Sequence, residues 1–100
     1  MGLGISKLTY HESNASRRNE DACINNRDTN NIKNEINLDY KVIVDNVDYY
    51  NYCVEQNGLC NHALDDVGNG ITSINNKIDT YNLKQFENAC GGYFDHVQKV

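Results

Sequence analysis

Residues 71–81 read ITSINNKIDTY, and their spacing favours an α-helix. The large apolar residues of this stretch follow one another at steps of 3, 4 and 3 positions: Ile71, Ile74, Ile78 and Tyr81. Such steps place side chains on one face of a helix, where they can pack together against a core. The segment Gly68-Asn69-Gly70 comes directly before this stretch and predicts an interruption of regular secondary structure before the helix begins.

A further helix is predicted at the C-terminal end, with Thr80 or Asn82 as its N-cap. Its apolar face would consist of Leu83, Phe86, Cys90, Phe94 and Val97. Gly91-Gly92 weakens this helix by roughly 1 kcal/mol per glycine relative to alanine. The end of the chain is therefore predicted to be helical, with a weak point at the two glycines.

Residues 36–60 fit two interpretations. One is a helix with an apolar stripe that consists of Leu38, Val42, Val47, Tyr50 and Val54. The other is a short strand at residues 40–44, which are mostly β-branched or aromatic. Asn57-Gly58 can end a helix or close a hairpin. The predicted fold class is mostly α, a small helical body with a flexible N-terminal arm. The alternative is α+β with one short strand or hairpin around residues 40–60.

Composition divides the chain into two parts. Residues 1–35 are rich in polar residues and show no sustained period, which predicts a flexible N-terminal arm carrying an acylation signal. Residues 36–100 are predicted to form a small, mainly helical domain. Eight Ile, six Leu, seven Val and two Phe make 23 large core formers in 100 residues, enough for a thin core.

Charge is spread unevenly along the chain, whose formal net charge is −5. Residues 1–18 carry three basic side chains against one acid, and residues 34–100 carry four Lys against ten acids. An acidic body argues against nucleic-acid binding, which needs a basic face. No stretch approaches the roughly 20 apolar residues of a membrane span, and no secretory leader is recognisable. These observations predict a cytoplasmic protein.

The four cysteines lie at positions 23, 53, 60 and 90. In a cytosolic chain they are predicted to be reduced thiols, although four cysteines could also form a disulfide framework with three possible pairings. Cys53 and Cys60 are poor partners if they share one helix. Seven residues of helix rise roughly 10.5 Å, which exceeds the limit of about 7 Å between the Cα atoms of a disulfide.

The first seven residues, MGLGISK, fit an N-myristoylation signal. Removal of Met1 exposes the α-amine of Gly2 for acylation, and Ser6 and Lys7 complete the pattern. One myristoyl chain binds membranes only marginally, with an association constant of about 10⁴ M⁻¹. Lys7, Arg17 and Arg18 could each add roughly 1 kcal/mol near an anionic lipid surface.

Two metal-binding alternatives depend on weaker patterns. Residues 65–72, DDVGNGIT, resemble a degenerate EF-hand loop, and the opening SKL is similar to that of myristoylated neuronal calcium sensors. The loop lacks an acid at its third position and has Asn76 where a bidentate Glu is required. A zinc module would draw on Cys53, Cys60, His62 and Cys90 or His96, without a C-x₂-C pair. Neither a cofactor nor a metal site is predicted.

Together these patterns predict an N-myristoylated peripheral membrane accessory or adaptor protein that is non-enzymatic. A Cys–His pair such as Cys90 with His62 could be drawn, but no local signature supports catalysis. The predicted partners are a membrane surface, contacted through the lipid and the basic arm, and a protein. Enrichment in Asn, Ile, Lys and Tyr is typical of AT-rich genomes and suggests a virus, parasite or protist. The alternatives are an acidic protein-interaction domain without lipid and a metal-dependent switch.

Overall fold

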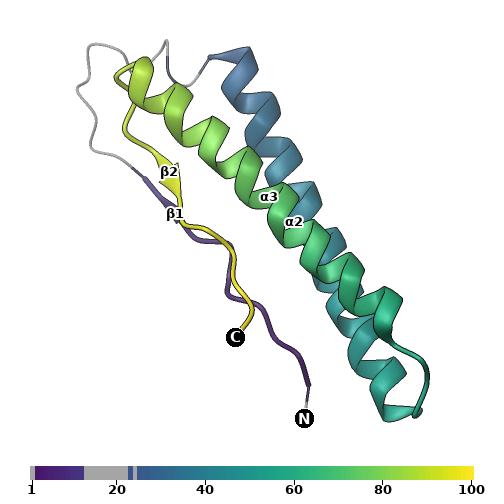
Figure 1. Cartoon of the computed structure of the whole chain (residues 1–100). Helices are drawn as coiled ribbons and strands as arrows, with labels where there is room; N and C mark the ends of the chain where they lie inside the picture. Colours follow the sequence, from purple (N-terminus) through teal and green to yellow (C-terminus); the bar gives the residue numbers. More distant parts are fainter. Residues whose placement is uncertain (1, 13–22, 24) are drawn as a thin grey trace.

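The computed structural model describes residues 2–12, 23 and 25–100, and shows a helical hairpin with two extended terminal segments along one side (Figure 1). The hairpin consists of α2 (Arg27–Glu55) and α3 (Asn61–Glu87). Strands β1 (Tyr10–His11) and β2 (Tyr93–Phe94) pair antiparallel beside it. The prediction of a mostly α fold is confirmed, and the short strands lie near the chain ends instead of around residues 40–60.

Local signals set both ends of α2. Asn26 is its N-cap, and the side-chain oxygen of Asn26 accepts a hydrogen bond from the Thr29 N–H at 3.1 Å. Beyond the last turn, Asn57 has a φ of 56°, and the Gly58 N–H donates to the Cys53 carbonyl at 3.0 Å. A left-handed residue after the last turn is a common helix ending. Asn57-Gly58 therefore ends a helix, and the alternative of a strand or hairpin around residues 40–60 is wrong.

Helix α3 runs without a break through Gly68 and Gly70, so the predicted break at this point is wrong. A Cβ atom on Gly70 would lie 2.9 Å from Cγ1 of Ile43 on α2. Gly70 therefore allows the two helices to approach closely instead of interrupting one of them. The helix ends at Glu87, where Ala89 has a φ of 55° and the Cys90 N–H donates to the Gln85 carbonyl at 2.7 Å.

The predicted separate C-terminal helix is wrong: α3 continues through Thr80 and Asn82 to Glu87, so neither residue is an N-cap, and the residues after Cys90 are extended. The spacing of Phe94 and Val97 predicts that both side chains are buried, and both are, at 3% and 1% exposure. They reach the core from an extended segment whose alternation of inward and outward side chains is interrupted between them. An interrupted strand and a helix can therefore share the same apolar spacing.

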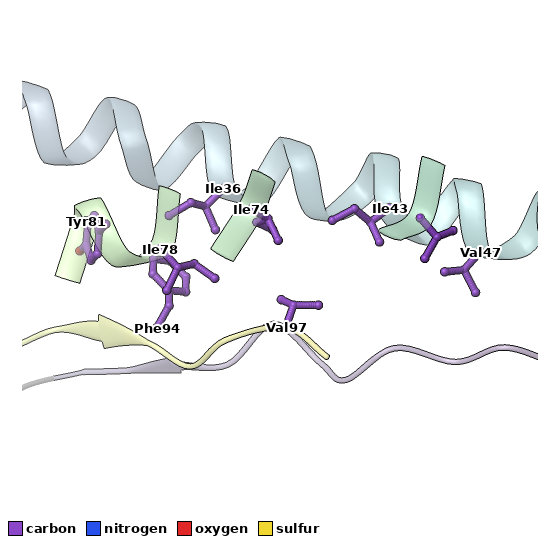
Figure 2. Close-up of a cluster of buried hydrophobic side chains, with 9 residues drawn as sticks. Ile36, Ile43, Val47, Ile74, Ile78, Tyr81, Phe94 and Val97 are labelled. Atoms are coloured by element: carbon purple, nitrogen blue, oxygen red, sulfur yellow. The ribbon is translucent and has the colours of Figure 1, made fainter. Parts of the chain in front are cut away.

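The core lies between the hairpin and the extended segments (Figure 2). Its buried residues come from α2, α3 and the C-terminal segment: Ile36, Ile43, Val47, Val67, Ile74, Ile78, Tyr81, Phe94 and Val97. The predicted apolar face of residues 71–81 is confirmed, with Ile71 only partly buried. The stripe predicted on α2 is largely wrong, because Leu38, Val42 and Val54 are exposed.

Residues 4–11 and 93–100 pair in one antiparallel register, called the terminal ribbon below. The paired residues are Ile5 with Lys99, Tyr10 with Phe94, and His11 with Tyr93. Backbone hydrogen bonds of the same register join Ser6 to Gln98, Val100 to Gly4, and Asp95 to Thr9, at 2.8–3.1 Å. This pairing holds residues 4–11 of the predicted N-terminal arm against the hairpin. The boundary predicted at residue 35 lies inside α2. Residues 13–22 of the predicted arm are outside the described part.

Asparagine side chains hold the extended segments against the helices. Asn75 accepts a hydrogen bond from the Val97 N–H at 2.8 Å and donates to the Val97 carbonyl at 2.9 Å. Asn82 forms the same pair of bonds with Phe94, and Asn51 forms it with Leu3. At Leu3, Phe94 and Val97, an asparagine amide thus makes the two backbone hydrogen bonds that a neighbouring strand would otherwise make. We call these contacts the asparagine clamps.

Two disulfides lie at opposite ends of the hairpin. Cys23 is bonded to Cys90, with Cα atoms 5.8 Å apart, and Cys53 to Cys60, with Cα atoms 5.9 Å apart. The prediction of reduced thiols is therefore wrong in this structure. Cys53 and Cys60 would be too far apart only within one continuous helix, whereas α2 ends at Glu55 and the chain reverses direction before Cys60.

Candidate functional site

The residues of the predicted acylation signal belong to the terminal ribbon or adjoin it. Gly2 is exposed, and a Cβ atom there would lie 3.1 Å from Oδ1 of Asn51, which also accepts the Leu3 N–H. The Ser6 hydroxyl accepts the Gln98 N–H at 3.0 Å, and the Ser6 carbonyl accepts the Tyr40 hydroxyl at 2.9 Å. Gly2 and Ser6 therefore each have a structural role that is independent of acylation.

The basic residues predicted to contact lipid are not brought together by the described structure. Lys7 is exposed, and Arg17 and Arg18 lie outside the described residues. Within the described residues, no helix is both long enough and apolar enough to cross a membrane. Among the described residues, only Gly2 and Lys7 belong to the predicted membrane contact.

The residues considered for metal binding are separated or already bonded. Residues 65–72 form successive turns of α3, so their side chains point outward in different directions and do not converge. Cys53, Cys60 and Cys90 are held in disulfides. His96 lies 2.6 Å from an Asp79 oxygen on the surface. No cluster of three or more potential metal ligands occurs among the described residues.

A pocket of about 520 Å³ lies at the C-terminal end of α3. Its walls include Glu12, Gln85, Phe86, Cys90 and Tyr93. Gln85 is only 6% exposed, and its Oε1 atom has no hydrogen-bond partner among the residues that the structure describes. A buried amide oxygen without a partner lowers the stability of the folded chain. Among these lining residues no nucleophile is paired with a base, because Cys90 is bonded to Cys23.

An aromatic cluster stabilises the helix end near this pocket. Tyr10, Tyr81 and Phe94 meet edge to face, with ring centroids 4.7–6.2 Å apart. The Tyr10 and Tyr81 hydroxyls are 2.9 Å apart. Burial, together with this hydrogen bond, raises the pKa of Tyr81 above its ordinary value. Tyr81 therefore stays protonated at neutral pH and acts as a structural group.

The outward side of α2 carries a stripe of exposed apolar side chains, which we call the outer face. It consists of Leu38, Val42, Tyr49 and Tyr52, which are 57–63% exposed. At about 100° of rotation per residue, these four positions fall within roughly one quarter of the helix circumference. Ile43 and Val47, on the opposite side of α2, are buried in the core.

Sequence reasoning missed the outer face because it merged two stripes into one. Leu38 and Val42 were grouped with Val47, which faces the core. The spacing of Leu38, Val42, Tyr49 and Tyr52 was available as a signal, since these residues form a stripe of their own. The asparagine clamps had no signal, because 17 Asn residues are spread over the whole chain.

Comparison with protein-family models, with curated proteins and with solved structures finds no match for this chain.

Proposed function

We propose that this protein is a non-enzymatic interaction module that binds another protein through the outer face of α2. The observation that carries the proposal is the exposure of four large apolar side chains in one stripe, each at least 57% accessible. Contiguous exposed apolar surface on a small protein typically marks an interaction site. Two of the four are tyrosines, a residue type enriched at protein interfaces.

The rest of the fold suits such a role because it holds α2 rigidly. Gly70 lets α3 pack closely on α2, and Lys77 on α3 forms an ion pair of 2.6 Å with Asp39 on α2. The Cys53–Cys60 disulfide closes the turn at one end of the hairpin. A helix fixed in this way presents its outer face with little loss of conformational entropy on binding.

Photo-crosslinking tests the proposal. A benzophenone amino acid replaces Tyr49 on the outer face in one variant, and Tyr93 on the terminal ribbon in a control variant. The two tyrosines are 63% and 49% exposed, so both probes are accessible. We expect a discrete crosslinked protein adduct in producing cells from position 49 and none from position 93. Equal yields from both positions, or no adduct from position 49, would overturn the proposal.

We propose as a second candidate a peripheral membrane adaptor that is anchored by a myristoyl group on Gly2. It is supported by the MGLGISK opening and by the exposure of Gly2. It ranks second because it assumed a cytosolic chain with reduced thiols, whereas disulfides persist mainly in oxidising environments.

Membrane fractionation of two matched variants tests the lipid candidate. Gly2→Ala removes the acylation site, and Gly4→Ala is the control. In both variants the added Cβ atom would lie 3.1 Å from its nearest neighbour, an atom of Asn51 or of Val100. We expect Gly2→Ala alone to leave the membrane fraction, and the intact mass of the wild type to show a myristoyl group. An unmodified Gly2 in the native protein dismisses this candidate.

A further inference from the structure

The outer face of α2 has the spacing of a coiled-coil seam. Leu38, Val42, Asp45, Tyr49 and Tyr52 follow one another at steps of 4, 3, 4 and 3 positions. All five side chains belong to exposed residues. Alternating steps of 3 and 4 give an average repeat of 3.5 residues, which is the repeat of a coiled coil. Such a repeat keeps the stripe facing one partner helix along its whole length.

We infer that the outer face pairs with the outer face of a second copy of this chain, the two α2 helices running antiparallel. The inference rests on the proposed function, since it names the partner of the same surface. In an antiparallel pair the alternating seam positions of one helix meet those of the other. Leu38 of each copy then packs against Tyr49 of the other, and Val42 lies against Asp45.

Charge selects the antiparallel direction. Lys41, Asp45 and Asp48 are exposed and, within the described part of the chain, form no ion pair. In the antiparallel arrangement Lys41 of each copy lies beside Asp45 and Asp48 of the other. A parallel arrangement would stack Asp45 on Asp45, and like charges at a seam position are repulsive. The same three residues thus favour one orientation and disfavour the other.

The seam spans about two heptads, which is short for a coiled coil. Asp45 lies within it, and a carboxylate at a seam position fixes orientation at a cost in stability. The pairing is therefore reversible and depends on protein concentration. Replacing this carboxylate by an apolar side chain should strengthen the pairing, which gives the inference a test in the positive direction.

Sedimentation velocity of the full, oxidised chain, from low micromolar to millimolar concentration, tests the pairing. We expect a concentration-dependent dimer for the wild type, a tighter dimer for Asp45→Leu, and a monomer for Val42→Lys. Leu83→Lys is the matched control, because Leu83 on α3 and Val42 are both 57% exposed. Circular dichroism confirms that each variant keeps its helices, which is expected for substitutions at exposed positions.

A charge exchange separates specific pairing from general stickiness. Lys41→Asp and Asp48→Lys should each weaken dimerisation by about tenfold, because each places like charges at both symmetry-related contacts between positions 41 and 48. The double variant K41D/D48K should recover most of the loss. A wild type that stays monomeric throughout the series overturns the inference, and so does a double variant as weak as its single parents.

The failure of this inference can be distinguished from the failure of the proposed function. A monomeric wild type whose position 49 still crosslinks to a different protein refutes pairing with a second copy and leaves the interaction module intact. A monomer without any crosslink from position 49 refutes both.

Discussion

Both sides of α2 carry large apolar side chains, but those on one side are buried and those on the other are exposed to solvent. Ile43 on the inner side is 1% exposed, whereas Val42, its neighbour in sequence, is 57% exposed. The difference arises from what packs on each side. The inner side receives α3, brought close at Gly70, and the terminal ribbon, held by the asparagine clamps. The apolar content of a helix therefore does not reveal which of its stripes is buried within the chain.

The largest expected effect comes from removing the Cys23–Cys90 disulfide, which lies beside the terminal ribbon at one end of the hairpin. The Cys23–Cys90 bond joins residues 67 positions apart, whereas Cys53–Cys60 spans 7. Loop-closure entropy predicts a loss of about 4 kcal/mol of unfolding free energy for Cys23→Ala/Cys90→Ala, and about 2 kcal/mol for Cys53→Ala/Cys60→Ala. Guanidinium unfolding of both double variants measures this difference; equal losses would contradict the loop-length argument.

Neighbouring substitutions compare the two sides of α2 directly. Ile43→Ala removes buried methylene and methyl groups next to Gly70, and should lower the unfolding free energy by about 3 kcal/mol. Val42→Ala removes groups that are already in water and should change it by less than about 0.5 kcal/mol. Denaturant unfolding at concentrations below dimerisation gives both values. A comparable loss for Val42→Ala would mean that the outer face is packed within the monomer.

An asparagine clamp offers a test with a matched charge change. Asn75→Asp keeps an acceptor for the Val97 N–H but removes the donor to the Val97 carbonyl, and should cost about 2 kcal/mol. Asn76→Asp places the same charge one position away on an exposed residue and should cost almost nothing. The deficit of Asn75→Asp should shrink below about pH 4, where the new carboxyl becomes protonated and can donate. A deficit that does not change with pH would argue against the clamp.

The smallest expected effect belongs to the Lys77–Asp39 ion pair between α3 and α2. Lys77→Met should cost less than about 1 kcal/mol, because the two side chains are 36% and 33% exposed. The hydrogen bond that Lys77 donates to the Asp39 carboxylate raises the pKa of Lys77 above its ordinary value of 10.5. A raised lysine pKa gives stability that is present below the ordinary value and is lost as pH rises through the shifted one. The difference between the wild type and Lys77→Met should therefore disappear in strongly alkaline solution.

The buried face of α3 could be predicted from periodicity, whereas the buried face of α2 and the ribbon could not. Ile74, Ile78 and Tyr81 lie where their spacing placed them. The ribbon escaped prediction because residues 2–11 are short of strand-forming runs, and Phe94 and Val97 have helical spacing. The pairing between residues 4–11 and 93–100 is non-local, so no local pattern indicates it.

Among the candidate sites, too, some features could be predicted from the sequence and others depend on the fold. The acylation signal was visible in the sequence, but its Ser6 also binds Gln98 at the other end of the chain. The unpaired Gln85 oxygen depends on burial, which only the fold reveals. The Cys53–Cys60 pairing depends on the left-handed backbone conformation of Asn57, which ends α2. The sequence Asn57-Gly58 is compatible with this conformation but does not require it.

The terminal ribbon also determines an order of assembly. The two helices are joined by a short turn, whereas Ser6 and Gln98 are 92 positions apart, so the hairpin should close first. During synthesis, the segment that carries Leu3 and Ile5 must wait until residues 93–100 have left the ribosome. For that interval the core residues of the hairpin lack their cover, and this is when a newly made chain is most exposed to aggregation and most in need of a chaperone.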